Sequence, residues 1–194
     1  MSGQAGVAAS GRQQIVVSGV GGQGVLFVTR LLADAAILRG ASVLTSETHG
    51  MAQRGGVVLS HLKAGDFASP LVRSGQADGL IVLKEEILPL HRRFLSPGGW
   101  VVMNAVRPPA EEERETIHTV DADGLAQETG NLQSANLILL GFALSRLGMA
   151  ETGGLLFCSP DDVRAALRQR LGERESLLAA SLAALALGIS RGTR

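Results

Sequence analysis

The chemistry that this chain could carry is concentrated in two glycine-rich segments. The first, Gly19-Val20-Gly21-Gly22-Gln23-Gly24, matches the G-x-G-x-x-G pattern of turns that bind dinucleotides. Glycines let the backbone approach a ligand closely, and a following helix offers free N–H groups and a positive dipole end to a phosphate. Glu47 has the position of the acid that binds a ribose hydroxyl in NAD enzymes. These features favour nucleotide binding; the alternative is that the glycines only allow a helix to pack closely on a strand.

The second segment, His49-Gly50-Met51-Ala52-Gln53-Arg54-Gly55-Gly56, places an imidazole, an amide and a guanidinium on one loop. Arg54 suits a carboxylate or a phosphate, and His49 can exchange a proton near neutral pH. The alternative is that both side chains only fasten the loop to neighbouring carbonyl groups. An NAD dehydrogenase also needs a second region to hold its substrate, and the residues after this loop do not predict one.

Both segments need a scaffold that brings them to one edge. Ile15–Val17 predicts a strand that ends at the first glycines, and the apolar spacing of Gly24–Arg39 predicts a helix closed by Gly40. Ser42–Thr45 predicts a second strand that runs into Glu47. A strand, a glycine turn, a helix and a strand form the opening of an α/β fold, so we expect a Rossmann-like, three-layer domain with a mostly parallel sheet.

The remaining chain continues this alternation within one domain. Further strands are predicted at Val57–Leu62, Leu80–Leu83, Trp100–Met103 and Ile117–Val120. Helices are predicted at Glu85–Phe94, Asn136–Leu147, from Ser159-Pro160 onward, and at Leu171–Gly188, with a turn at Ser96–Gly99. We expect residues 1–13 to be a disordered leader and residues 14–190 to form a single domain.

Composition excludes several classes of function. Eighteen Lys and Arg balance eighteen Asp and Glu, and aromatic residues make up 3%, so we expect no nucleic-acid partner. The one cysteine, Cys158, excludes an internal disulfide, a cysteine-held zinc site and a self-contained iron–sulfur cluster. No apolar run reaches the length of a membrane span or a signal peptide. We therefore expect a cytoplasmic protein with no membrane partner.

Both glycine-rich segments resemble a known enzyme family. VSGVGGQGV at 17–25 and SETHGMAQRGGVVLSHLKAG at 46–65 are similar to the gamma-type subunit or domain of 2-oxoacid:ferredoxin oxidoreductases. Within that family the chain is most similar to the beta-subunit type of indolepyruvate ferredoxin oxidoreductases. Asn136, followed by Leu139-Leu140-Gly141, also resembles an Asn-containing helix of the family. The resemblance spans roughly residues 14–190.

The resemblance implies a subunit that carries no cofactor. Such enzymes decarboxylate a 2-oxoacid on thiamine diphosphate, pass electrons through [4Fe–4S] clusters to ferredoxin and release an acyl-CoA. This chain lacks the family's Gly-Asp-Gly signature for Mg²⁺ and diphosphate, and one cysteine cannot hold a cluster. The resemblance therefore implies a larger alpha subunit that holds thiamine diphosphate, Mg²⁺ and [4Fe–4S], with CoA and ferredoxin entering the complex. It implies that this chain packs against the thiamine-binding parts and contributes to the substrate or CoA channel.

The candidate site residues follow from the two segments. His49 and Arg54 are the candidates for chemistry, and the contacts to a ligand or to the partner's cofactor are assigned to Gly19, Gly21, Gly22, Gln23, Gly24, Glu47 and Gln53. We expect indolepyruvate or another aryl pyruvate as the substrate. Two alternatives stay open: an NAD(P)-binding dehydrogenase or sensor that uses Glu47, and a purely structural assembly module.

Other polar side chains receive structural interpretations. His61 alternates with apolar neighbours on a predicted strand and is expected to be structural. His91, beside Arg92 and Arg93, is expected on a short exposed helix. Cys158 precedes a predicted helix, a position that lowers a thiol pKa, but we expect it to be a small buried hydrophobe.

Overall fold

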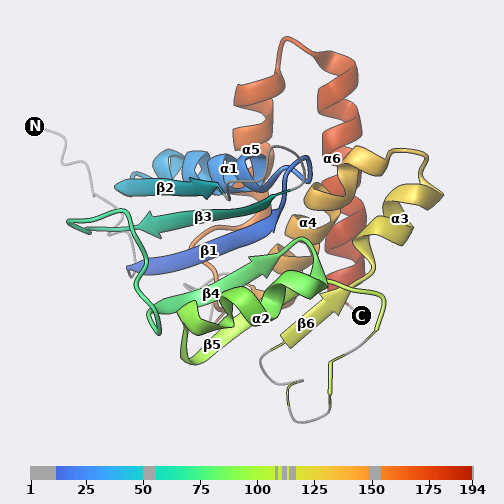
Figure 1. Cartoon of the computed structure of the whole chain (residues 1–194). Helices are drawn as coiled ribbons and strands as arrows, with labels where there is room; N and C mark the ends of the chain where they lie inside the picture. The colour runs from blue at the N-terminus through green and yellow to red at the C-terminus, as the bar shows by residue number, and fades with distance from the viewer. Residues whose placement is uncertain are drawn as a thin grey trace, which may run out of the picture.

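The sheet has six strands, and one of them runs against the others. The computed structural model describes residues 12–49, 56–107, 109–110, 113, 117–148 and 154–193. The strand order is β2-β3-β1-β4-β5-β6 (Figure 1). The strands are β1 (Gln13–Val20), β2 (Val43–His49), β3 (Val57–Ala64), β4 (Ala77–Val82), β5 (Leu95–Asn104) and β6 (Ile117–Val120). β3 is antiparallel to β1 and β2, and the other pairings are parallel. This confirms the predicted α/β fold with a mostly parallel sheet.

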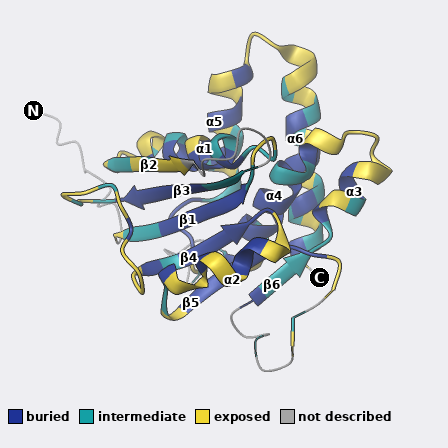
Figure 2. Ribbon diagram, in the orientation of Figure 1, coloured by how far each residue is buried: buried dark blue, intermediate teal, exposed yellow. Residues whose placement is uncertain are grey.

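Helices of unequal size cover the two faces of the sheet. One face carries α1 (Val25–Leu38), α4 (Ala135–Leu147), α5 (Pro160–Leu171) and α6 (Glu175–Gly192), with α3 (Ala122–Glu128) at its margin. The other face carries the short segments η1 (Glu85–Ile87), α2 (Leu88–His91) and η2 (Arg92–Phe94). The central strands and the inner helices are largely buried, the edge strand β2 is half-buried to exposed, and the connection between α5 and α6 projects away from the sheet and is exposed (Figure 2).

The central strand β1 is buried on both faces. Ile15 and Val17 belong to the core under the long helices, and Val16 points to the core under the short ones. All three side chains are 0% exposed, as expected for a strand with helices on both sides of its sheet. The end of β1, where the glycines begin, is therefore held in place from both sides.

Helix α6 closes the domain by packing on α4 at very short range. A Cβ atom built on Gly188 would lie 2.0 Å from the carbonyl oxygen of Ile138 in α4. A Cβ on Gly141 of α4 would lie 2.2 Å from the carbonyl oxygen of Leu185. The two helix backbones can approach this closely only because these positions lack side chains. The alanine- and leucine-rich segment predicted at the C-terminus therefore completes the core.

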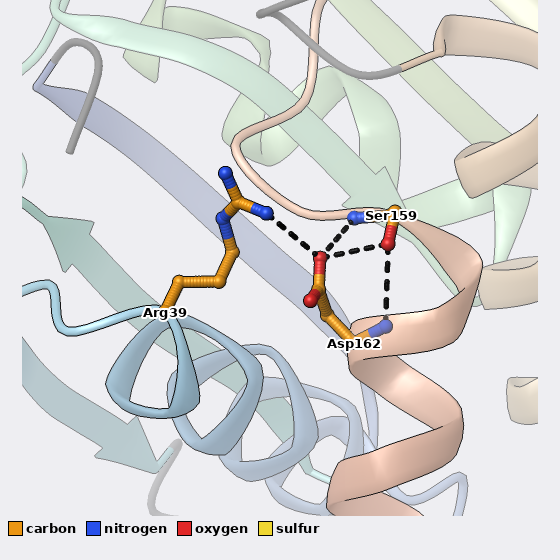
Figure 3. A network of polar contacts seen from close by, with 3 residues as sticks. All are labelled: Arg39, Ser159 and Asp162. Carbon is orange, nitrogen blue, oxygen red and sulfur yellow. Dashed lines mark hydrogen bonds and ion pairs between the residues drawn. The ribbon is translucent and has the colours of Figure 1, made fainter. Parts of the chain in front are cut away.

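A polar network fastens the C-terminal end of α1 to the start of α5 (Figure 3). The Ser159 Oγ accepts a hydrogen bond from the Asp162 backbone N–H at 3.2 Å, and Asp162 Oδ2 accepts from the Ser159 N–H at 2.8 Å, which completes a capping box. Arg39, at the end of α1, donates to the same carboxylate oxygen at 3.3 Å. The predicted helix start at Ser159 is confirmed, and the same network links the start of α5 to the end of α1, the helix that follows the glycine turn.

Several local predictions need correction. Ser96–Gly99 is part of β5 and not a separate turn, because β5 absorbs the extra residues as a bulge. Ala77 pairs with Leu95 and Gly79 pairs with Trp100, so two steps along β4 correspond to five along β5. The helix predicted at Glu85–Phe94 is a succession of three short helical segments. Helix α3 was not predicted.

The last residue of the predicted leader belongs to the sheet. Gln13, its last predicted residue, already belongs to β1 and pairs with Ala64 of β3. Residues 1–11 lie outside the described residues.

Candidate functional site

The glycine turn, Gly19–Gly24, lies at the point of the sheet where ligands commonly bind. From β1 the chain passes through α1 to β2 on one side, and from β4 it continues to β5 on the other side. A crevice opens at such a switch point, outside the carboxyl ends of the two adjacent strands. The turn connects the carboxyl end of β1 to α1, as the sequence predicts.

Two glycines of the turn are required by close packing. A Cβ on Gly19 would lie 2.9 Å from both Gln23 Oε1 and Val25 Cγ2. Gly24 has a φ of +81°, and its Cβ would lie 2.1 Å from Asn136 Nδ2. The structural alternative therefore accounts for Gly19 and Gly24, because any larger side chain would displace neighbours at these positions.

The other two glycines face outward. Gly21 is exposed, and its N–H donates to the Gly56 carbonyl at 2.9 Å, which ties the turn to the start of β3. Gly22 has a φ of +94°, is exposed, and would place a Cβ with nothing within 4 Å. Gly22 is thus a position of the turn that a ligand or partner backbone can approach closely.

Gln23 holds the turn in shape with both ends of its amide. Its Oε1 accepts from the Val20 N–H at 2.9 Å, and its Nε2 donates to the Leu83 carbonyl at 3.2 Å. Asn136 on α4 donates from Nδ2 to the Gln23 carbonyl oxygen at 3.1 Å. The Gln23 side chain, which the sequence analysis assigned to ligand contact, therefore bridges the ends of β1 and β4.

A second amide, Asn104, was missed by the sequence analysis. Asn104 is 8% exposed at the end of β5, and its Nδ2 donates to the Leu83 carbonyl at 3.2 Å. Its Oδ1 accepts from the Ala122 N–H at 2.9 Å and from the Asp123 N–H at 3.4 Å, the first two N–H groups of α3. A lone Asn at the end of an apolar strand was the available signal, since such a position at the carboxyl edge needs a polar partner.

Two cavities lie on either side of Gly22, which lines both. The amide crevice has a volume of about 170 Å³ and is lined by Leu132 and, with polar side chains, by Gln23, Asn104, Asp123, Gln133 and Asn136. The arginine crevice has a volume of about 480 Å³ and is lined by the outer glycines, the first turn of α1, Arg30 and Arg170. The turn therefore separates one crevice whose lining includes a carboxylate from one whose lining includes two guanidinium groups.

The two arginines are positioned by acidic neighbours. Arg30 Nη2 lies 3.9 Å from Glu47 Oε1, and the Arg30 side chain is 58% exposed. Arg170 Nε donates to Asp34 Oδ2 at 2.9 Å, which joins α5 to α1. Both arginines line the same crevice as the first turn of α1, where the helix dipole also favours an anion.

Glu47 does not lie on a strand adjacent to β1. β3 is inserted between β1 and β2, and Glu47 pairs with Ser60 of β3. With strands about 4.8 Å apart, β2 lies about 10 Å from β1. The carboxylate reaches Arg30 at the rim of the arginine crevice.

The second glycine-rich segment is described only at its ends. His49 is the last residue of β2 and its backbone pairs with Val58, while Gly56 bonds to the turn through Gly21. The segment therefore starts and ends at the same sheet edge as the turn. The His49 side chain, Gln53 and Arg54 lie outside the described residues.

His91 is buried, which corrects its predicted exposure. It is 7% exposed, and both His91 and His61 pack around Phe94, with ring centroids 6.2 and 5.5 Å from that ring. Burial lowers the pKa of both histidines, and each also faces nearby positive charge. His61 Nδ1 accepts from the Val72 N–H at 3.3 Å, which confirms its structural interpretation.

Cys158 is fully buried, as expected, and burial raises the pKa of its thiol. A thiol in this state is neither a nucleophile nor a ready metal ligand. Within the described ranges, no group of three or more His, Cys, Asp or Glu side chains could hold a metal ion. The described helices include none that is long and apolar enough to cross a membrane.

Comparison with known proteins places this architecture in a family. The family model described as pyruvate ferredoxin/flavodoxin oxidoreductase matches residues 14–191. The indolepyruvate oxidoreductase subunit IorB of Archaeoglobus fulgidus is 34% identical over 158 residues, which cover 71% of this chain and 79% of that protein.

Two solved structures share the fold. The gamma subunit of a keto/oxoacid ferredoxin oxidoreductase from Geobacter sulfurreducens superimposes with a TM-score of 0.71 at 24% identity, over 93% of this chain and 98% of that one. The 2-oxoglutarate:ferredoxin oxidoreductase of Magnetococcus marinus gives a TM-score of 0.74 at 20% identity over 93% of this chain. This chain spans 31% of that longer protein. The family match over nearly the whole chain, together with the 34% identical relative, shows that the chain belongs to the pyruvate ferredoxin/flavodoxin oxidoreductase family.

Proposed function

We propose that this chain is the small subunit of a 2-oxoacid:ferredoxin oxidoreductase that acts on indolepyruvate or another aryl pyruvate. The observation that carries the proposal is its 34% identity to an indolepyruvate oxidoreductase subunit over 71% of the chain. In this proposal a larger partner subunit holds thiamine diphosphate, Mg²⁺ and [4Fe–4S] clusters, and ferredoxin takes the electrons. Thiamine diphosphate supplies the electron sink for decarboxylation, and CoA accepts the acyl group.

The donor set of the described residues supports placing the cofactors elsewhere. The single cysteine is buried and its thiol pKa is raised, so it does not offer a thiolate to iron. The described acidic side chains do not gather with histidines in a group that suits a metal ion. What this chain does offer is the sheet edge with its glycine turn and two crevices.

The arginine crevice supports a role in binding the anionic part of CoA. Arg30 and Arg170 line it together with the first turn of α1. The N-cap of that helix is Gly24, which has no side chain to accept hydrogen bonds from the N–H groups of the first turn. Guanidinium groups and free helix N–H groups are the donors that bind phosphates in proteins. Its volume of about 480 Å³ lies within the usual range for small-molecule sites.

The strand order disfavours the NAD(P)-binding alternative. In dinucleotide-binding folds the ribose acid stands at the end of the strand next to β1. Here β3 occupies that place, and Glu47 lies one strand further out, beside Arg30. The φ of +94° at Gly22 is itself a reason for glycine there, so the purely structural alternative is decided by the substitutions below.

Reconstitution tests the proposal. The chain, co-expressed with the large subunit of the same complex, should support indolepyruvate- and CoA-dependent reduction of ferredoxin or methyl viologen. The chain alone, supplied with thiamine diphosphate, Mg²⁺ and CoA, should show no turnover. Turnover by the isolated chain would contradict the assignment of both cofactors to the partner, and micromolar NADH binding that is lost in Glu47→Ala would favour a dehydrogenase or sensor.

Single substitutions separate the roles of the two glycine-rich segments. Arg30→Ala should raise the KM for CoA about tenfold with little change in kcat, because it removes binding shared by ground and transition states. Arg54→Ala should lower the activity of the complex at least tenfold, about 1.4 kcal/mol in the barrier, with a nearly unchanged melting temperature. Arg168→Ala, at an exposed position of α5 that lines neither crevice, is the matched control. A lowered melting temperature with normal turnover in Arg54→Ala would instead make that arginine structural.

A further inference from the structure

The amide crevice has a chemistry that differs from that of the arginine crevice. Among the described residues that line it, Asp123 alone is charged, and no Arg, Lys or His contributes. The nitrogens of Gln23, Asn104 and Asn136 already donate to backbone carbonyls inside the fold. The oxygens of Gln23 and Asn104 are likewise engaged by backbone N–H groups, so the distinctive group of the described lining is the Asp123 carboxylate. An anionic ligand would meet that carboxylate with no Arg, Lys or His side chain in the described lining to compensate it.

The size of the amide crevice suits a single side chain. Its volume of about 170 Å³ lies below the range of about 300–1,000 Å³ that is usual for small-molecule sites. Protein interfaces, in contrast, commonly seat one anchoring side chain in a pocket of this kind, and arginine is among the residues enriched there. Leu132 stands at the rim with 71% of its surface exposed, where it can cover an aliphatic stem.

We propose that the amide crevice is the socket for an arginine side chain of the partner subunit. The guanidinium group would donate to the Asp123 carboxylate and to the Asn136 amide oxygen, while its stem packs against Leu132. Arginine fits better than lysine because its planar fork presents several donors at once to a carboxylate and an amide oxygen. This inference rests on the proposed assembly with a partner, and it concerns a surface separate from the one proposed for CoA.

The position of the crevice gives this contact a direct route to the glycine turn. Asn136 also donates to the Gln23 carbonyl, and Gly22 lines both crevices. An arginine bound to the Asn136 side chain would therefore contact the residue that also packs against Gly24 and holds the Gln23 carbonyl. Partner docking on one side of the turn would then fix the wall of the arginine crevice on the other side.

The first arm of the test uses amino-acid probes on the isolated full-length chain. N-acetyl-arginine methylamide is titrated into ¹⁵N-labelled protein, and the backbone amides of Leu132, Gln133 and Asn136 are followed by NMR. The citrulline analogue is its neutral isostere and should bind at least tenfold more weakly. Equal binding of the two probes, or tighter binding of the lysine analogue, would overturn the assignment.

The second arm measures the affinity of the chain for the large subunit. Asp123→Asn should raise the dissociation constant at least tenfold, whereas Glu128→Gln, which removes the same charge from the same helix α3 outside the crevice, should leave it within twofold. Equal effects of the two substitutions would overturn the proposal. If the wild-type chain fails to bind the large subunit at all, the proposed function fails, and the probe titration still decides whether the crevice binds a guanidinium group.

Discussion

Replacing Gly24 by alanine tests how the glycine turn is held. The residue has a φ of +81°, where a side chain costs about 1–2 kcal/mol. The new Cβ would lie 2.1 Å from Asn136 Nδ2, so Asn136 must move and its bond to the Gln23 carbonyl is lost, which costs about 1 kcal/mol more. We expect Gly24→Ala to lower the free energy of unfolding by about 2–3 kcal/mol and the melting temperature by about 5–10 °C.

A matched control isolates the contact with Asn136. Gly22 has a similar φ of +94° but nothing within 4 Å of its Cβ position, so Gly22→Ala should cost only the backbone strain. Urea unfolding of both variants, alone and in the Asn136→Ala background, gives the coupling energy. Gly24→Ala should couple to Asn136→Ala by about 1 kcal/mol, and Gly22→Ala should not couple. Equal losses in the two glycine variants, or an absent coupling, would refute the reasoning.

Three further changes probe the frame around the site. Gly188→Ala should lower the free energy of unfolding by about 3 kcal/mol or more, as measured by chemical unfolding. The new Cβ would lie 2.0 Å from the Ile138 carbonyl oxygen, and a helix backbone cannot move aside as a side chain can. Burial lowers the pKa of His61 and His91 in the folded state. On acidification below about pH 6.5 the two histidines therefore bind protons more readily in the unfolded chain than in the folded one. The free energy of unfolding should therefore fall on acidification from about pH 7.5 to 5.5, and fall less when both are replaced by Gln. Ser159→Ala should cost about 1 kcal/mol through loss of the α5 cap, measured by thermal melting.

These three predictions have controls in exposed parts of the chain. Ser176→Ala, on the exposed start of α6, and Ser74→Ala, in an exposed turn, should each change stability by less than about 0.5 kcal/mol. An equal pH dependence in the wild type and the double histidine variant would show that the depressed histidine pKa values do not govern acid sensitivity.

The sequence predicts the strand, turn and helix around the glycines because their signals are local. Apolar periodicity and a glycine pattern act within about twenty-five residues, and the structure has β1, the turn and α1 where they are expected. The insertion of β3 between β1 and β2 is a pairing between distant segments, and no local pattern specifies it. The consequence is large, because it separates Glu47 from the strand it would adjoin in a dinucleotide-binding fold.

The contacts that Asn104 and Asn136 make were out of reach for a related reason. Asn104 and Asn136 lie on β5 and α4, and each acts by hydrogen bonding to a carbonyl of a different element. A single Asn in an apolar segment predicts that its side chain has a polar partner, but it does not predict which residue that partner is. The burial of His91 depends in the same way on distant partners, because His91 and His61 both contact Phe94 only once the short helical segments have folded onto the sheet.

The ties around the glycine turn bear on how this domain could serve a partner. Leu83, at the end of β4, accepts hydrogen bonds from both Gln23 and Asn104, and Asn136 holds the turn from α4. The conformation of the turn is therefore fixed during folding, and a ligand that binds beside it need not supply the free energy of ordering it. The charged lining is arranged differently, since Arg30 is largely exposed and reaches Glu47 only at 3.9 Å. A turn set rigidly by amides lies beside one arginine, Arg170, that Asp34 holds in place and a second, Arg30, that is loosely held at the rim. In this arrangement the backbone and Arg170 define where an anion sits, and Arg30 adjusts to it.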